Sequence, residues 1–174
     1  MGTKFTFALA LTITQAVFSL LMYFTGFQTE KLATGQYIQW LGFVIMFVVL
    51  WLGIKAVREE REHGAISYGQ AVGAGVVISL LSGLMTSVYT FIHFKFINTS
   101  FVDYQMEILR GRWAEAGLTD PQMEQAENMT RMMMGPAMSA VMTCVGMLIV
   151  GLILSLIIAA FVKRAAPLNA EPAP

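Results

Sequence analysis

Methionine clustering is the feature of this sequence that comes closest to a chemical site. Of the 13 methionines, seven fall in one stretch: Met123, Met129, Met132, Met133, Met134, Met138 and Met142. Thioether sulfur is a soft ligand that suits Cu(I), so Met132, Met133 and Met134 together with His93 form a candidate site for this ion. Packing is the competing interpretation, because unbranched methionine fills irregular gaps and no second histidine or cysteine lies on the same side. We therefore expect no resident metal or cofactor, with Cu(I) as the alternative.

Two polar side chains within apolar stretches are the other candidates. His93 lies beside Tyr89 and Phe94, which is typical of an amphipathic anchor at a membrane surface, with a ligand contact as the alternative. Gln15 lies in the middle of another apolar stretch, where an interhelical hydrogen bond is the first expectation and a substrate contact the second. The sequence has no phosphate-binding glycine loop, HExxH motif, or nucleophile paired with a base. We predict that the protein is not an enzyme.

The elements that would position these residues are membrane helices. The 174 residues are 56% hydrophobic and 13% charged, and the mean hydropathy is +0.64. Four stretches of 25, 23, 32 and 31 residues contain no Asp, Glu, Lys or Arg, and about 20 residues are enough to cross the hydrocarbon core. We predict spans at about 5–27, 37–57, 68–94 and 137–162. Because these cores hold no Asp, Glu, Lys or Arg, coupled transport is disfavoured.

Boundary residues agree with these spans. Gly26 is placed to end the first helix, while Ser67 followed by Gln70 has the spacing of a capping box at the start of the third. Gly135 then Pro136 indicates a stop followed by a new helix, because proline is tolerated in a first turn. Tyr37 and Trp40 would mark the membrane interface at one end of the second span.

The segment 98–135 between the last two spans is predicted to form a helical hairpin. One helix would end at Gly117, and the next would begin with Asp120 as its N-cap and Pro121 as its first residue. The apolar faces at helical spacing are Phe101, Tyr104, Ile108, Leu109 and Trp113, then Met123, Ala126, Met129 and Met133. The hairpin would lie on the lipid headgroups or cover the mouth of the bundle.

Small residues form stripes at four-residue spacing on two spans, which favours close helix packing. The third span carries Ala71, Gly75, Ser79, Gly83 and Ser87, beside a GxxxG pair of Gly69 and Gly73. The last span carries Ser139, Thr143, Met147, Gly151, Ser155 and Ala159. Packing within one bundle is the first interpretation, and a seam between copies of the chain is the second.

Basic residues predict the orientation. Six flank the span ends on one side (Lys4, Lys55, Arg58, Arg61, Lys163 and Arg164), whereas the other five fall on the hairpin side among seven acids. By the positive-inside rule both termini, Pro174 included, would be cytoplasmic and the hairpin extracytoplasmic. Eleven basic and eleven acidic residues cancel, so no charge excess favours nucleic-acid binding. The single cysteine, Cys144, excludes an internal disulfide.

The sequence also resembles a known family. The charged turn followed by Gly64–Ala71, then Lys95–Asn98, Pro136 and the closing run Gly151–Arg164, are similar to the bacterial membrane proteins catalogued as domain of unknown function 4199. Thr99 stands where members often carry proline. The resemblance covers nearly the whole chain and implies a four-span inner-membrane protein with an outer helical loop. It implies no catalytic residue.

Together these observations predict an all-α integral membrane protein, with residues 1–174 forming one four-helix bundle domain. We expect a non-enzymatic structural or accessory subunit of a bacterial inner membrane, acting through helix packing and its outer hairpin. Its partners would be the lipid bilayer and a membrane protein or a second copy, without nucleic acid. The alternative is a carrier or sensor of lipid or Cu(I) that uses the methionine cluster.

Overall fold

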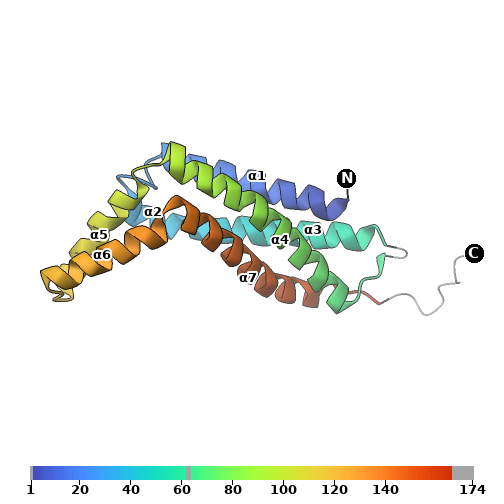
Figure 1. The fold of residues 1–174 in the computed structure, drawn as a ribbon. Helices are drawn as coiled ribbons and strands as arrows, with labels where there is room; N and C mark the ends of the chain where they lie inside the picture. Colours follow the sequence, from blue (N-terminus) through green and yellow to red (C-terminus); the bar gives the residue numbers. More distant parts are fainter. Residues whose placement is uncertain (1, 62–63, 166–174) are drawn as a thin grey trace, which may run out of the picture.

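The computed structural model describes residues 2–61 and 64–165, so the predicted cytoplasmic C-terminus at Pro174 lies outside the described residues. Figure 1 shows the arrangement of the helices along the chain. Their bounds are α1 Thr3–Phe24, α2 Leu32–Ile38, α3 Trp40–Glu59, α4 Tyr68–Ile92, α5 Phe101–Glu115, α6 Asp120–Met134 and α7 Pro136–Val162. Within the described residues, four helical segments are long and apolar enough to cross a membrane. This confirms the predicted all-helical class with four helices that are apolar enough to span a membrane.

The four long helices form a bundle whose ends are tied together by polar contacts. At one end, the Thr3 hydroxyl donates to the Glu60 carboxylate and the Arg58 guanidinium donates to the backbone oxygen of Val162. Ile66 and Arg164 exchange two backbone hydrogen bonds of 3.0 Å at the same end. The beginnings of α1 and α4 therefore meet the ends of α3 and α7, and α5 and α6 extend from the opposite end (Figure 1).

The second span begins earlier than predicted. Helical structure starts at Leu32 rather than at 37, and α2 and α3 together make one segment of 28 residues that is interrupted at Gln39. The prediction took Tyr37 and Trp40 as the membrane interface within the charge-free stretch, whereas α2 begins directly after Lys31. Gly35 faces the Phe27 carbonyl so closely that an added Cβ would lie 1.9 Å from its oxygen, so the connection before α2 folds tightly against the helix.

Helices α4 and α7 contact each other through the predicted small residues. A Cβ added at Gly75 would lie 2.8 Å from the Ser155 Cβ, and one added at Gly151 would lie 2.3 Å from the Ser79 Cβ. Each glycine thus faces a serine of the other helix. From the pair Gly75–Ser155 to the pair Ser79–Gly151, the residue number rises by four on α4 and falls by four on α7, as antiparallel packing requires. Small side chains let two backbones approach closely where lipid gives no hydrophobic drive.

The stripe does not extend to the predicted GxxxG pair. Gly69 and Gly73 are exposed, and an added Cβ at either position would meet nothing within 4 Å. They lie on the face of α4 that turns away from the other helices, because residues two positions apart on a helix do not share a face. The interior stripe of α4 is therefore Ala71, Gly75, Ser79 and Gly83, with Ser87 half-buried at its end.

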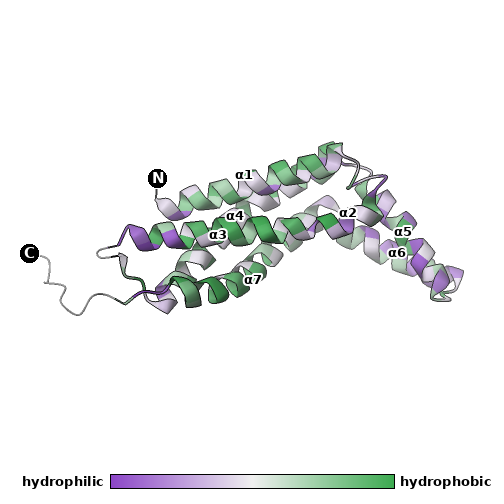
Figure 2. Ribbon diagram, turned by 180° about the vertical axis from the view of Figure 1, so that it is seen from behind, coloured by the Kyte–Doolittle hydropathy of each residue, from purple (hydrophilic) through white to green (hydrophobic). Residues whose placement is uncertain are grey.

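The outer surface of the bundle is apolar. Leu21, Val44 and Ile149 are each more than half exposed, and Figure 2 shows hydrophobic colouring along α3 and α7, with hydrophilic residues at the end of α3 and the far end of α5 and α6. So much exposed hydrophobic surface is stable only when lipid surrounds it. Length, composition and surface together describe a membrane protein.

Candidate functional site

Helices α5 and α6, with the turn between them, form an arm over residues 101–134. Gly117 has a φ of 78°, a conformation that glycine adopts without strain, and it ends the first helix as predicted. The N-cap of α6 is Thr119, not Asp120. The Thr119 backbone N–H donates to the Gln122 side-chain oxygen at 3.0 Å. The three-residue spacing of Thr119 and Gln122 forms a capping box, which outweighs the preference for aspartate as N-cap. Asp120 and Pro121 are therefore each one position further into the helix than predicted.

The two helices of the arm are joined by charged side chains. Glu127 of α6 accepts from the Arg110 Nε of α5 at 2.9 Å and from Arg131 Nε at 2.8 Å. Arg131 also donates to Asp103 at 2.8 Å. Hydrogen bonds from Arg131 and Arg110 lower the pKa of the Glu127 carboxyl below its ordinary value, and Asp103 and Glu127 raise that of Arg131. These charges fix the two helices relative to each other.

The methionines of α6 lie on two faces of the helix, whereas the sequence placed Met123, Met129 and Met133 on one face. The half-buried face contains Met123, Ala126, Glu127, Thr130 and Met134. Met129 and Met133, which were placed with Met123, are instead 58% and 51% exposed, and Met132 is 68% exposed. The prediction placed only apolar residues on this face, whereas the structure places Glu127 there, where it accepts hydrogen bonds from Arg110 and Arg131. The outer face of α6 therefore carries Met129, Met132 and Met133, and α6 buries no residue fully.

The arm is anchored to the bundle through α5. Met106 of α5 is 1% exposed, and the ring of Phe101 stacks on Phe94 at a centroid distance of 4.6 Å. Figure 1 shows the arm continuing obliquely away from the bundle end rather than folding back across it. Its outer methionine face is thus left uncovered by the rest of the described chain.

His93 is the centre of a buried polar cluster. Its side chain is 1% exposed, its Nε2 lies 2.9 Å from Gln28 Oε1, and its Nδ1 lies 3.2 Å from the Tyr89 hydroxyl. Asn98 donates to the Gln28 backbone oxygen at 3.3 Å, and the Gln28 amide donates to Ser19 at 3.3 Å. We call Ser19, Gln28, Tyr89, His93 and Asn98 the histidine cluster.

The histidine cluster closes the end of α4 around an unusual turn. Residues His93–Ile97 form a π-helical turn, and the Asn98 backbone N–H donates to the His93 oxygen at 2.7 Å. Both ring nitrogens of His93 face protein atoms within hydrogen-bonding distance, so this geometry does not direct a free nitrogen at the exposed Met132 or Met133. His93 and the methionines are not brought together into one site. The cluster instead ties the α1–α2 connection to the end of α4.

Gln28 and Asn98 were not predicted as partners. Among the sequence predictions Asn98 appears only in the run Lys95–Asn98 that resembles the family, yet it is 2% exposed and its side-chain amide is engaged within the protein. Gln28 follows the predicted helix stop at Gly26, and a polar residue at such a position is typical of a loop. A buried pairing between residues 65 to 70 positions apart leaves no local signal in one sequence.

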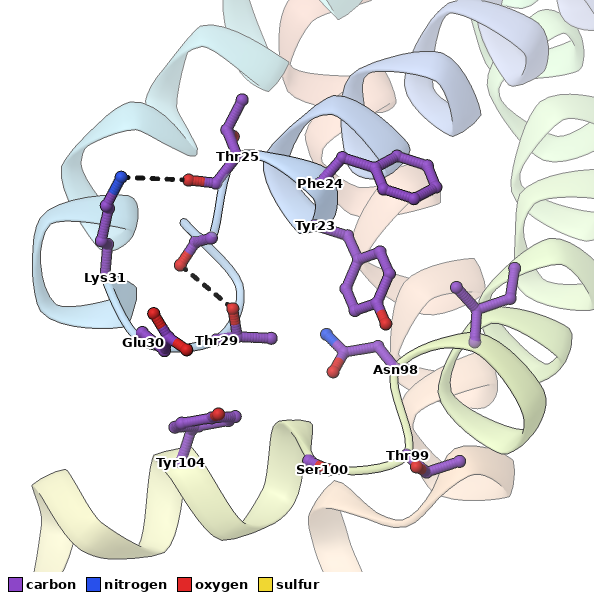
Figure 3. Close-up of a pocket in the computed structure, with 12 residues that line it drawn as sticks. Tyr23, Phe24, Thr25, Thr29, Glu30, Lys31, Asn98, Thr99, Ser100 and Tyr104 are labelled. Carbon is purple, nitrogen blue, oxygen red and sulfur yellow. Dashed lines mark hydrogen bonds between the residues drawn. The ribbon is translucent and has the colours of Figure 1, made fainter.

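A polar cleft of about 560 Å³ lies beside the cluster, between the α1–α2 connection and the start of α5. Figure 3 shows Tyr23 and Asn98 pointing toward each other, with Tyr104 of α5 on the opposite side. Lys31 reaches the backbone oxygen of Thr25 at 3.5 Å. Hydroxyls, aromatic rings and one residue of each charge line the cleft, which gives it donors and acceptors without a strong net charge. Such a surface suits headgroup contact at the membrane boundary.

The remaining predicted residues lie inside the bundle. Gln15 donates from Nε2 to the backbone oxygen of Gly42 at 2.9 Å and so joins α1 to α3. Ser155 donates to the Gly151 oxygen within α7, while Ala71 and Ala159 are 0% exposed. Within the described residues, no group of three or more His, Cys, Asp or Glu side chains is arranged to hold a metal ion.

Comparison with known proteins assigns the chain to a family. A family model described as a protein of unknown function, DUF4199, matches residues 6–164, which cover the arm and the four membrane helices apart from the first three residues of α1. No curated protein and no solved structure matches the chain.

Proposed function

The chain belongs to the DUF4199 family of proteins of unknown function, and on that premise we propose that it is a non-enzymatic accessory subunit of a membrane complex. In this proposal the four helices anchor the subunit and the arm binds a partner protein outside the bilayer. The observation that carries the proposal is the outer face of α6, where three methionines are more than half exposed on a helix fixed by ion pairs.

Two properties of the arm favour protein binding. Methionine side chains are flexible and polarisable, so they adapt to the surface of a partner. The two helices of the arm are also linked before binding, since Glu127 contacts both Arg110 and Arg131, and a surface that is already held in place loses less conformational freedom on association. A helix of 15 residues such as α6 is about 22 Å long, enough to span a protein interface.

The small-residue stripes do not supply this interface. Gly75 and Gly151 lie against serines of the same chain. An interface between two copies of the chain, which was the second interpretation of the stripes, would therefore have to use another surface. Enlarging these glycines would damage the bundle itself and could not report on a partner. The arm is the described surface that is both fixed and uncovered.

The arrangement of charges supports an extracytoplasmic arm on a bacterial inner membrane. The six basic residues that flank the spans belong to the beginning of α1, the end of α3 and the end of α7, which meet at one end of the bundle. The positive-inside rule assigns this end to the cytoplasm. The helical hairpin made by α5 and α6 then lies outside. A reporter fused after Pro174 is expected to be cytoplasmic, and an extracytoplasmic reporter would reverse the orientation.

The partner proposal is tested by native mass spectrometry of the protein extracted gently from its own membrane. We expect a stoichiometric complex with another protein, and we expect Met129→Glu combined with Met132→Glu to abolish it, because charge opposes burial of the methionine face. The matched control is Ala114→Glu with Ala116→Glu, which adds the same charge at exposed positions of the arm outside α6. A bare monomer in the wild type, or equal loss in both double variants, would refute the proposal.

A further inference from the structure

A second cavity lies within the membrane part of the bundle, away from the arm. Its volume is about 430 Å³, and residues of α1, α3, α4 and α7 line it. Its wall is mainly apolar, with Phe18, Phe43, Met46, Met147 and Val150 among the lining residues. This size falls within the range of small-molecule sites. Among the residues that the structure describes, no Asp, Glu, Lys, Arg or His lines the cavity, so it favours an uncharged occupant.

Two polar side chains of the lining have unused hydrogen-bonding capacity. Thr86 is 7% exposed, and its hydroxyl has no hydrogen-bond partner in the described part of the chain. Gln15 directs its Nε2 at the Gly42 backbone oxygen, 2.9 Å away. Because that backbone oxygen can only accept, Gln15 keeps Oε1 as a free acceptor. An unpaired hydroxyl in a dry interior is costly, so a ligand that bonds to it gains affinity there.

Gln15 and Thr86 lie at the same depth of the bundle. The Thr12 hydroxyl is 3.1 Å from the Ser82 hydroxyl, and the Tyr89 hydroxyl donates to the Ala16 oxygen at 3.2 Å. These two contacts bracket Gln15 on α1 and Thr86 on α4. The lining therefore offers the free acceptor of Gln15, with the unpaired Thr86 hydroxyl buried at the same depth of the bundle, beside a mainly apolar wall. Gln39 and Thr143 are the other polar residues of the lining.

We propose that this cavity binds the headgroup of a neutral lipid that carries a free hydroxyl, of the diacylglycerol class. The lipid hydroxyl would donate to Gln15 Oε1 and would accept from the Thr86 hydroxyl once rotation of the Thr86 side chain turns that hydroxyl into the cavity. Its ester and acyl groups would pack on the aromatic and methionine side chains. A quinone offers acceptors only and would leave Gln15 Oε1 unbonded. A phospholipid would bring a charge that no lining residue neutralises. This inference does not rest on the proposed role of the arm.

The structure offers a way to block the cavity without disturbing the fold. Gly146 lines the cavity, and a Cβ added there meets nothing within 4 Å. Gly146→Leu therefore fills the space that the ligand would use. Gly73→Leu is the matched control, because Gly73 is also helical and open to added atoms but does not line the cavity. Thr86→Val removes the hydroxyl while keeping the shape of the side chain.

The experiment measures binding of dioleoylglycerol to the full-length protein in detergent by native mass spectrometry, with dioleoylphosphatidylglycerol and a ubiquinone as comparison ligands. We expect a one-to-one adduct with dioleoylglycerol that Gly146→Leu abolishes and Gly73→Leu retains. Thr86→Val should weaken binding about fivefold, as expected for one hydrogen bond, and should leave the unliganded protein at least as thermally stable. Equal binding of the three ligands, an adduct unaffected by Gly146→Leu, or no adduct would overturn the proposal.

Discussion

The bundle interior and the arm are held together by opposite means. Between α4 and α7, glycine faces serine in both directions and no charge is present, so the contact depends on volume. Between α5 and α6, arginines and acids carry the contact at the exposed surface, so it depends on charge. In lipid, close packing replaces the hydrophobic effect, whereas exposed ion pairs fix geometry at small energies. The bundle should therefore be sensitive to added atoms, and the arm should be sensitive to the loss of charged side chains.

Enlarging a glycine of the α4–α7 contact should have the largest effect. Gly151→Leu would place its Cβ 2.3 Å from the Ser79 Cβ, so the helices must separate. We expect a loss of about 3 kcal/mol or more, seen as a thermal midpoint lower by about 10 °C in detergent. Gly73→Leu on the open face of α4 should leave the midpoint unchanged. Equal stability of the two variants would show that volume does not limit this contact.

A compensating pair of substitutions tests the same contact between α4 and α7. Gly151→Ala should cost about 1–3 kcal/mol because the new methyl overlaps Ser79. Adding Ser79→Gly removes the obstructing side chain and should recover most of that loss, apart from about 1 kcal/mol for a glycine within a helix. A double-mutant cycle on thermal or denaturant unfolding gives the coupling energy. Simple additivity of the two changes would mean that Gly151 and Ser79 do not face each other.

The histidine cluster lies between the two regions and should respond at an intermediate level. His93→Leu removes the contacts to Gln28 and Tyr89 and should cost about 1–3 kcal/mol through polar groups left unpaired. Amide hydrogen exchange should rise in residues 25–31 and 93–98 while the centre of α7 stays protected. A uniform rise of amide exchange throughout the bundle would instead mean that His93 stabilises the whole bundle.

Loss of charge in the arm should have the smallest effect. Glu127→Gln weakens the links to Arg110 and Arg131, whereas Glu124→Gln changes an exposed acid on the same helix and serves as control. We expect unchanged thermal unfolding of the bundle, with faster amide exchange in α5 and α6 for Glu127→Gln only. Added salt should reduce the difference, since exposed charges are screened. A shift of the bundle midpoint would contradict the division between the regions.

The pH dependence of the arm follows from the same residue. Its arginine partners lower the pKa of Glu127 in the folded arm, so its contribution is fully present above the ordinary carboxyl pKa of about 4.3. The contribution is lost as the pH falls through the lower, folded-state pKa. The protection factors of the α5 and α6 amides, which correct for the intrinsic pH dependence of exchange, should therefore fall at acidic pH in the wild type. Glu127→Gln should remove that component of the pH dependence.

Much of the fold was predictable because the bilayer imposes simple rules. Long gaps between charged residues gave the four spans, and the four-residue period of small side chains identified the positions that face each other across α4 and α7. The local rules failed where distant residues decide the outcome. Glu127 sits on the inner face of α6 because two arginines meet it, and Gln28 is buried because His93 and Asn98 reach it. Neither pairing is visible in a single sequence without the fold.

Amide hydrogen exchange compared between the protein in its own membrane and the purified monomer tests the central claim most directly. The account predicts that α4 and α7 are equally protected in both samples, because the bundle holds itself together. It predicts that α6 is more protected in the native membrane, where a partner covers Met129, Met132 and Met133. Equal exchange of α6 in both samples, or a difference confined to α4 and α7, would contradict it.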